Sequence, residues 1–486
     1  MDYKVKFHGG KFMALIPLAI FILFCVLFFV VFKVFEMEAL ATGGFIGLLV
    51  GSLFAKNWKN YWQAVLDGVS DPMNAVLMMI LIVVGIFTAL MARSGVAQGF
   101  VWLGNMIGLT GGLFTAFTFV ATCVIATATG TSIGTLFSAF PILYPSGILL
   151  GANPLTLAGA ILSGAIFGDN LAPVSDTTIA SAATQQYQNK EGSADIGGVV
   201  ASRFKYAITA ALISMALFFI FGGGGSVGSG AEDILATYSN PKGLIMLIPV
   251  AILLYVAIKT RDIFIALTWG IVSGSVVGLV FNIISFSDII MLEEFVFSGF
   301  IYDGVKNMMG LVIFSISLFS LIGLLKASGT MDAVIEGLST SKMATSVAGT
   351  EAVMALGVMF SGLTLGAASG PAIIMFGPIA NRLGQEKNLH PYRRANLIDG
   401  FANTLPTVLP FISAFIFIAL TVVQGLQGEY SFIEDITPIQ IAYSSFYPLV
   451  LFLVLSYSVV TGWGREFEGD NGDPVKQDGR VTEKVS

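Results

Sequence analysis

Two aspartates lie seven positions apart in the stretch FGDNLAPVSDTT, which runs from Phe167 to Thr178 between long apolar segments. Asp169 and Asp176 flank a proline, Pro173. An unpaired carboxylate at the centre of a bilayer costs about 2.5–3.5 kcal/mol on insertion scales. Two such acids therefore need partners or a use. They are either structural, hydrogen-bonded to free amides or close to the cytoplasmic boundary, or they bind a cation, and we favour the second interpretation.

Pro173 predicts a broken helix over residues 155–185. A proline removes a backbone donor and clashes with the preceding turn, so the helix should unwind between Asp169 and Ser175. Carbonyl oxygens freed there would join side-chain oxygens that suit a small hard cation such as Na⁺. These side chains are Asp169, Asn170, Ser175, Asp176, Thr177 and Thr178. A cation beside a carboxylate displaces its proton, so we predict that Asp169 and Asp176 bind Na⁺ and H⁺ in competition.

A second broken helix is predicted over residues 395–424, around Pro406. Its polar side chains are Asn403, Thr404 and Thr407, preceded by Asp399. No acid follows this proline, so the two breaks should not be equivalent. Asp399 either contributes to ion binding or is paired with Arg393 and Arg394 at the cytoplasmic edge.

Two hairpins, over residues 113–150 and 346–380, precede the broken helices. Their tips are rich in small and hydroxyl residues, namely Thr129, Gly130, Thr131 and Ser132 in the first and Gly366, Ser369 and Gly370 in the second. Such tips allow backbone to approach a ligand, and helix N-termini favour an anion. Small residues also simply permit tight helix packing in membranes. Their recurrence ahead of both broken helices favours a functional role.

The composition places these motifs in a membrane protein. The 486 residues are 55% hydrophobic and only 11% charged, with a mean hydropathy of +0.85. No basic stripe suggests a nucleic-acid partner, and Cys25 and Cys123 are too isolated for a disulfide framework or thiolate metal site. No cofactor is expected besides Na⁺ as a transported or coupling ion. Simple spans are predicted near residues 12–35, 39–54, 73–92, 204–221, 243–258, 263–284, 307–325 and 440–460.

An internal repeat divides the chain. LIPLAI at Leu15 returns as LIPVAI at Leu247, GTSIG at Gly130 as GAASG at Gly366, and NLAP at Asn170 as NTLP at Asn403. We predict a first repeat over residues 1–221, a linker over 222–242, a second repeat over 243–462 and a disordered cytoplasmic tail over 463–486.

Each repeat would contain about five spans, one re-entrant hairpin and one broken helix. An odd number of spans inverts the second repeat relative to the first. All but four of the 24 Lys and Arg residues (Lys33, Arg93, Lys242 and Lys306) then fall in cytoplasmic segments when the N-terminus is inside. We therefore expect an all-α, multi-pass protein of the cell (inner) membrane with both termini cytoplasmic.

The segment GDNLAPVSDTT closely resembles the Gly-Asp-x-x-(Ser/Ala)-Pro-x-Ser-Asp-Thr-Thr signature of NhaC-type Na⁺/H⁺ antiporters. The resemblance implies the ion-transporter-superfamily fold, with inverted repeats, two re-entrant hairpins, a dimeric scaffold and a moving transport domain. It also implies an ion-site role for Asp169, Ser175, Asp176, Thr177 and Thr178. This sequence has Asn170 where many relatives carry lysine and Ala172 where many carry serine.

The predicted function is electrochemically driven Na⁺/H⁺ exchange, by a transporter and not an enzyme. The alternative is Na⁺- or H⁺-coupled transport or exchange of a small organic anion or amino acid, since some members of the family exchange malate for lactate or carry amino acids. A membrane aspartyl protease would normally bring its two acids from different spans, and no nucleotide-binding or familiar hydrolase motif is present. A passive channel fits broken helices and hairpins less well than alternating access does.

Overall fold

The computed structural model describes residues 4–477 except 33–36, 226–238, 261 and 294–295. These residues are mostly helical. Among them, nine helices are long and apolar enough to cross a membrane, or ten if one bent pair counts as a span. The chain is thus a multi-pass membrane protein, as its composition predicts.

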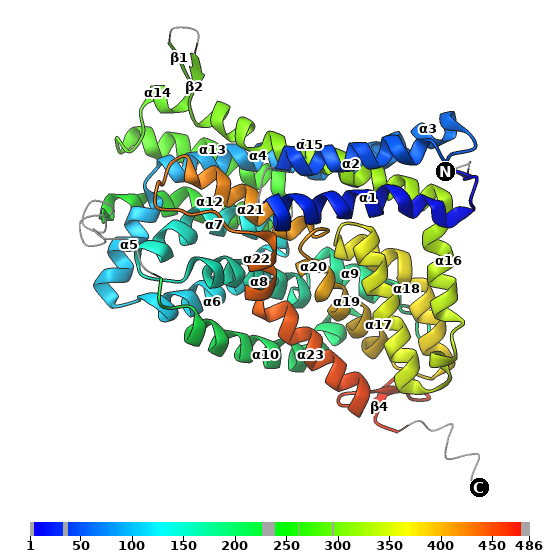
Figure 1. Cartoon of the computed structure of the whole chain (residues 1–486). Helices are drawn as coiled ribbons and strands as arrows, with labels where there is room; N and C mark the ends of the chain where they lie inside the picture. Colours follow the sequence, from blue (N-terminus) through cyan, green and yellow to red (C-terminus); the bar gives the residue numbers. More distant parts are fainter. Residues whose placement is uncertain (1–3, 33–36, 226–238, 261, 294–295, 478–486) are drawn as a thin grey trace.

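One layer of helices lies along the upper side of Figure 1. Its long member α15 packs against α2, α3 and α4, while α12 packs against α13. At the closest approach, any side chain on Gly68 of α3 would collide with the backbone of α15 at Phe319 and Gly323. The layer comprises α1 (Leu15–Val26), α2 (Met37–Ser52), α3 (Trp58–Ser70), α4 (Pro72–Arg93), α12 (Leu247–Thr260), α13 (Ile263–Val280) and α15 (Phe300–Ser328).

The first hairpin is formed by α6 (Gly111–Thr129) and α7 (Ser132–Leu149), close to its predicted limits. Gly130 turns the chain in a left-handed conformation, with φ 68°. A Cβ on Gly130 would collide with Val174, so the tip lies directly against the first helix break. The hairpin follows α5 (Val96–Ile107), which the sequence analysis did not predict.

The first broken helix consists of α8 (Pro154–Leu171) and α9 (Asp176–Ala183). Asn153 caps the start of α8, and the helix continues to Leu171, so the break covers only residues 172–175. The predicted unwinding from Asp169 was therefore wrong at its start. Pro173 restricts mainly the residue before it, which leaves Asp169 in the last turn of α8. The following helix, α10 (Ile196–Phe221), lies on the side opposite α15 together with α23 (Figure 1).

The second hairpin and second broken helix follow α15 in the same order. The hairpin is α17 (Val347–Thr364) and α18 (Ser369–Glu386), and the broken helix is α19 (Pro391–Ala402), α20 (Leu405–Val408) and α21 (Ala414–Gln427). Pro406 lies in the first turn of α20, so it begins a short helix after the break at Asn403. The inverted relation of the two repeats stays a prediction.

Shorter elements complete the described chain. The predicted span at residues 440–460 is two helices, α22 (Pro438–Ser444) and α23 (Phe446–Thr461), bent by 52°. In the described parts of the predicted spans at 12–35 and 39–54, the apolar helices Lys11–Val26 and Met37–Ser52 are shorter than 18 residues. The others are α14 (Phe286–Ile289), α16 (Thr330–Ser339), η1 (Lys11–Ala14), the π-helix η2 (Leu27–Phe32), η3 (Pro241–Met246), η4 (Lys342–Thr345), and the hairpin β1 (Met291–Glu293) with β2 (Val296–Ser298).

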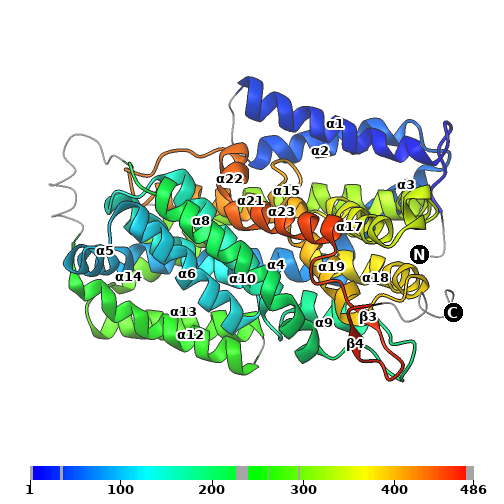
Figure 2. The same cartoon turned by 90° about the horizontal axis from the view of Figure 1, so that it is seen from below.

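The C-terminal segment corrects another expectation. Residues 463–477 are ordered and include the antiparallel pair β3 (Phe467–Glu468) and β4 (Pro474–Val475). Phe467 also bridges to Leu389, which holds the pair against the loop between α18 and α19. Figures 1 and 2 place this pair and α3, which lies near the N-terminus, toward the same end of the molecule. Most of the predicted linker, residues 226–238, lies outside the described part of the chain.

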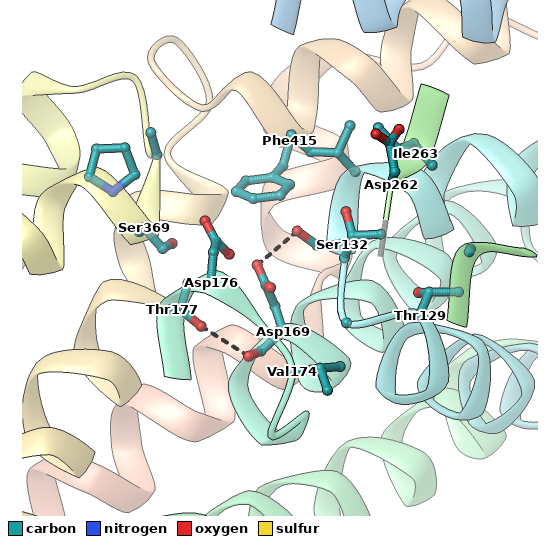
Figure 3. Close-up of a pocket in the computed structure, with 17 residues that line it drawn as sticks. Thr129, Ser132, Asp169, Val174, Asp176, Thr177, Asp262, Ile263, Ser369 and Phe415 are labelled. Atoms are coloured by element: carbon teal, nitrogen blue, oxygen red, sulfur yellow. Dashed lines mark hydrogen bonds between the residues drawn. The ribbon is translucent and has the colours of Figure 1, made fainter. Parts of the chain in front are cut away.

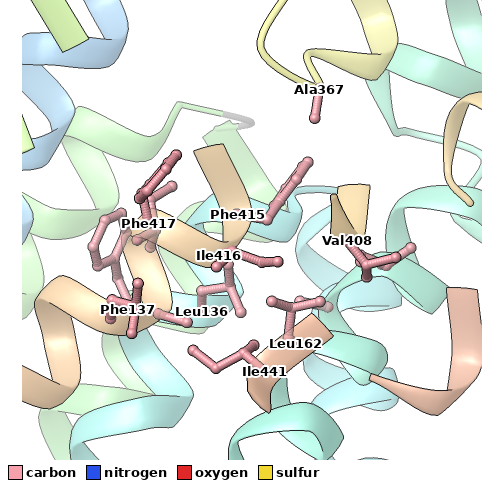
Figure 4. Close-up of a cluster of buried hydrophobic side chains, with 14 of the residues drawn as sticks. Leu136, Phe137, Leu162, Ala367, Val408, Phe415, Ile416, Phe417 and Ile441 are labelled. Atoms are coloured by element: carbon pink, nitrogen blue, oxygen red, sulfur yellow. The ribbon is translucent and has the colours of Figure 1, made fainter. Parts of the chain in front are cut away.

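An apolar core supports the two breaks. Figure 4 shows Leu136 and Phe137 of α7, Leu162 of α8, and Ile416 of α21 gathered around Ile441 of α22. All five are buried. Because lipid is as apolar as these side chains, helices in a membrane gain stability mainly from close packing. The core therefore fixes the hairpin, the broken helices and α22 relative to one another.

Candidate functional site

A pocket of about 320 Å³ lies where the two hairpin tips meet the first helix break (Figure 3). Its described lining contains two acids that flank the break, Asp169 and Asp176, and a third, Asp262, at the start of α13. No described lining residue is basic. The lining comprises Thr129, Gly130, Thr131, Ser132, Ile133, Asp169, Val174, Asp176, Thr177, Ala257, Asp262, Ile263, Ala368, Ser369, Gly370, Pro371 and Phe415.

Asp169 is the buried acid of the pocket, with 5% of its surface exposed. Its carboxylate accepts hydrogen bonds from Ser132 of the first hairpin tip at 2.8 Å and from Ser175 of the break at 2.6 Å. The hydroxyl of Thr177 donates to the Asp169 backbone carbonyl at 3.0 Å (Figure 3). That carbonyl has no helical donor because the residue four positions on is Pro173. The proline thus leaves this carbonyl free for the Thr177 hydroxyl.

Asp176 is the first residue of α9 and is exposed into the pocket. A Cβ added to Gly370, in the first turn of α18, would collide with its carboxylate. The acid of the first repeat therefore lies against the hairpin tip of the second. The positive end of α9 stabilises a negative charge at this position.

Four described helices begin at the pocket: α7 at Ser132, α9 at Asp176, α13 at Ile263 and α18 at Ser369. Their N-terminal amides place partial positive charge around the two carboxylates. Within the described residues, no three His, Cys, Asp or Glu side chains are grouped to hold a metal ion. A sodium ion in this pocket would use hydroxyl and carbonyl oxygens beside the two carboxylates, the ligand types that hard cations prefer.

Asp399 lies in a separate, fully buried cluster. Its carboxylate pairs with Arg203 of α10 at 2.7 Å and accepts hydrogen bonds from Asn170 at 3.1 Å and from Asn403 at 3.0 Å. Tyr447 donates to the side-chain oxygen of Asn170 at 3.1 Å. Asn170 and Asn403 therefore both bond to Asp399, and none of the three lines the pocket.

The remaining predicted residues lie elsewhere. Thr178 accepts a hydrogen bond from Arg203, and the hydroxyls of Thr404 and Thr407 donate to carbonyls of their own segment. Gly366 packs toward Leu318 of α15. The two halves of the chain thus contribute almost equally to the pocket. Of the predicted residues, Thr129 to Ser132, Asp169, Asp176 and Thr177 line it from the first half, and Ser369 and Gly370 line it from the second.

Arg393 and Arg394, near the second break, do not form the predicted ion pair with Asp399. Arg393 does not pair with Asp399 but donates to Glu351, whose side chain is fully buried at the start of α17, at 2.7 and 3.0 Å. Arg465 of the C-terminal segment donates to the same carboxylate at 3.1 and 2.7 Å. Arg394 instead contacts Asn381. Glu351 thus joins the second hairpin, the second broken helix and the chain end.

Four functional candidates escaped the sequence reasoning. Asp262 and Phe415 line the pocket from α13 and α21, and Arg203 and Glu351 form buried ion pairs. The distribution of Lys and Arg placed Arg203 in a cytoplasmic segment, and no prediction was made for Glu351. The available signal for Arg203 was its position directly before the predicted span at residues 204–221, where a buried charge needs a partner.

Residues 8–193 match the model of the Na⁺/H⁺ antiporter family. The malate-2H⁺/Na⁺-lactate antiporter of Bacillus subtilis (strain 168) is 28% identical over 264 residues, covering 53% of this chain and 54% of that protein. The arginine/ornithine antiporter ArcD of Halobacterium salinarum is 25% identical over 393 residues, 76% of this chain and 78% of that one.

The Na⁺/H⁺ antiporter NhaC of Bacillus subtilis (strain 168) is 24% identical over 305 residues, 59% of this chain and 64% of that protein. The chain therefore spans about half the length of the malate-lactate antiporter and somewhat under two thirds of NhaC. The matches support a transporter rather than an enzyme. Together they confirm the resemblance carried by the Gly168–Thr178 motif: the chain is similar to NhaC-type Na⁺/H⁺ antiporters.

Proposed function

We propose that this chain exchanges Na⁺ for H⁺ across the membrane, with Asp169 and Asp176 binding either ion. The observation that carries the proposal is the shared pocket in which a buried, hydroxyl-bonded carboxylate and a second carboxylate face both hairpin tips. The relation to Na⁺/H⁺ antiporters supports the choice of ions.

Competition at one site is sufficient for exchange. When Na⁺ occupies the pocket, it neutralises charge on the carboxylates and displaces their protons. When Na⁺ leaves, protonation neutralises them instead. A pocket with both carboxylates ionised and no bound cation would carry two negative charges without a counter-ion, a costly state within the membrane. Exchange is coupled because the transporter does not move its binding site across the membrane when neither Na⁺ nor H⁺ is bound.

Transport by purified protein in liposomes tests the proposal. An imposed pH gradient should drive ²²Na⁺ uptake in the wild type, and Asp176→Asn should abolish it while the protein remains folded by thermal melting. Asp435→Asn is the matched control, because Asp435 is an exposed aspartate outside the pocket. Wild-type uptake by Asp176→Asn, or no gradient-driven uptake by any variant, contradicts the proposal.

A second candidate is coupled transport of a small organic substrate. The pocket volume, about 320 Å³, exceeds the space of a bare Na⁺ ion, and two relatives are named for organic substrates. The acidic lining favours a substrate with an amino group over one with two carboxylates. Thermal shift with a panel of amino acids and organic acids distinguishes the candidates, because a substrate that binds the folded state raises its melting temperature.

The wider arrangement is part of the same proposal. We infer cytoplasmic termini from the distribution of Lys and Arg, two inverted repeats from the recurring motifs, and a homodimer from the family resemblance. Asn403, Thr404 and Thr407 of the second break would act through Asp399 and the packing around it, since they lie away from the pocket.

A further inference from the structure

Arg203 is a buried cation that the exchange chemistry described above does not use. It lies in α10 with 1% of its surface exposed. Its guanidinium pairs with Asp399 of α19, so the ion pair joins the first repeat to the second. Breaking such a pair by removing one partner leaves an uncompensated buried charge, whereas the intact pair is neutral.

The guanidinium also contacts both sides of the first helix break. On one side it donates to the backbone carbonyl of Asn170, in the last turn of α8. On the other side it donates to the hydroxyl of Thr178 at 3.0 Å and of Ser181 at 3.3 Å, both in α9. The Asn170 carbonyl is available because the helix has ended before Val174, its normal donor partner. Arg203 therefore replaces a helical hydrogen bond that the break has removed.

These contacts lie one residue from Asp169 and two residues from Asp176. Asn170 follows Asp169 directly, and Thr178 lies in the first turn of α9, which Asp176 begins. A planar guanidinium with several fixed donors holds such partners in a defined geometry. Any change in the separation of α8 and α9 would move the two carboxylates relative to each other.

We propose that Arg203 is a positioning residue: it clamps the two ends of the broken helix and neutralises Asp399, so that Asp169 and Asp176 alone exchange ions. The inference rests on the proposed function for its transport readout. It reassigns Asp399 from a candidate ion ligand to the fixed partner of an internal cation. It also explains why the uncharged Asn170 suffices at its position, because Arg203 already supplies a positive charge beside that residue.

A charge-relocation experiment tests this role. Arg203→Gln should lower Na⁺/H⁺ exchange by more than about tenfold, since displacement of reacting groups by 1 Å can cost about 100-fold. The Asn170 amide lies 3.1 Å from Asp399, so Asn170→Lys should bring an ammonium group to the same carboxylate. The double variant Arg203→Gln/Asn170→Lys should recover most of the lost exchange. Arg382→Gln, at an exposed arginine, is the matched control.

Amide hydrogen exchange supplies a readout that does not depend on transport. Peptides covering residues 169–178 should exchange faster in Arg203→Gln and return toward the wild-type rate in the double variant. If Arg203→Gln does not fold, Arg203→Lys keeps the charge but loses the guanidinium fork, and should show the faster amide exchange by itself.

The outcomes separate this inference from the proposed function. Unchanged transport and unchanged amide exchange in Arg203→Gln overturn the inference, as does a double variant with an ordered break but no recovery of transport. Absence of Na⁺/H⁺ exchange in the wild type contradicts the proposed function instead, and the amide-exchange comparison then still decides whether Arg203 clamps the break.

Discussion

Removing the Ser132 hydroxyl should weaken Na⁺ binding in a way that depends on pH. Ser132 lies at the tip of the first hairpin, is 4% exposed, and donates to Asp169 at 2.8 Å. In Ser132→Ala, the carboxylate keeps its bond from Ser175 but loses one of two hydroxyl donors. The ionised acid loses more from this change than the protonated acid, so the proton competes better against Na⁺.

The size of the effect on Na⁺ binding follows from the strength of the hydrogen bond between Ser132 and Asp169. A hydrogen bond to a charged group contributes about 1.5–3 kcal/mol. Since about 1.4 kcal/mol corresponds to a tenfold change in an equilibrium constant, the Na⁺ concentration for half-maximal exchange should rise about 10- to 100-fold near neutral pH. The difference should shrink as the pH rises, because fewer protons then compete for Asp169.

The assay measures the Na⁺ dependence of exchange in proteoliposomes at several fixed pH values. Ser138→Ala is the matched control, because this hydroxyl of the same helix bonds only to backbone carbonyls of its own turn. A half-maximal Na⁺ concentration for Ser132→Ala equal to that of the wild type throughout the pH range would refute the reasoning. A weakening of equal size at every pH would show instead that the hydroxyl binds Na⁺ directly.

Two further predictions concern the second hairpin and the contacts of the described C-terminal segment, residues 463–477. Gly370→Ala should reduce exchange about 100-fold by displacing the Asp176 carboxylate, while Gly337→Ala, where no atom lies near the added methyl group, should transport normally in the same liposome assay. His390, in the loop outside the candidate spans, has its pKa lowered from 6.5 by burial, although its bond to the Gly472 carbonyl opposes the shift. The neutral imidazole therefore stabilises the folded state fully above pH 6.5, the pKa in the unfolded chain, and this stabilisation is lost as the pH falls through the lower pKa of the folded state. The melting temperature should drop on acidification in the wild type and less in His390→Gln.

The broken helix could be predicted because its causes are local. Pro173 acts on its own neighbours, and Asp169, Ser175 and Thr177 are brought together within one turn of it. The start of the break was less predictable, since Pro173 restricts mainly the residue before it and the helix continues to Leu171.

The buried ion pairs could not be predicted from local sequence. Arg203 and Asp399 are 196 positions apart, and only the packing of α10 beside α19 brings them together. In the same way, nothing in the sequence around Glu351 predicts its ion pair with Arg465. The C-terminal residues look disordered because they are charged and rich in glycine, yet their order comes from contacts such as that of Phe467 with Leu389.

The cluster around Glu351 also has a consequence for biosynthesis. Its first arginine lies 42 residues downstream and its second 114 residues downstream. At a synthesis rate of about 5–20 residues per second, the ribosome needs about 6–23 s after Glu351 to add the last of them. During that interval the Glu351 carboxylate lacks its ion pair with Arg465. A nascent chain released before residue 465 can therefore never form this contact between the second hairpin and the C-terminal segment.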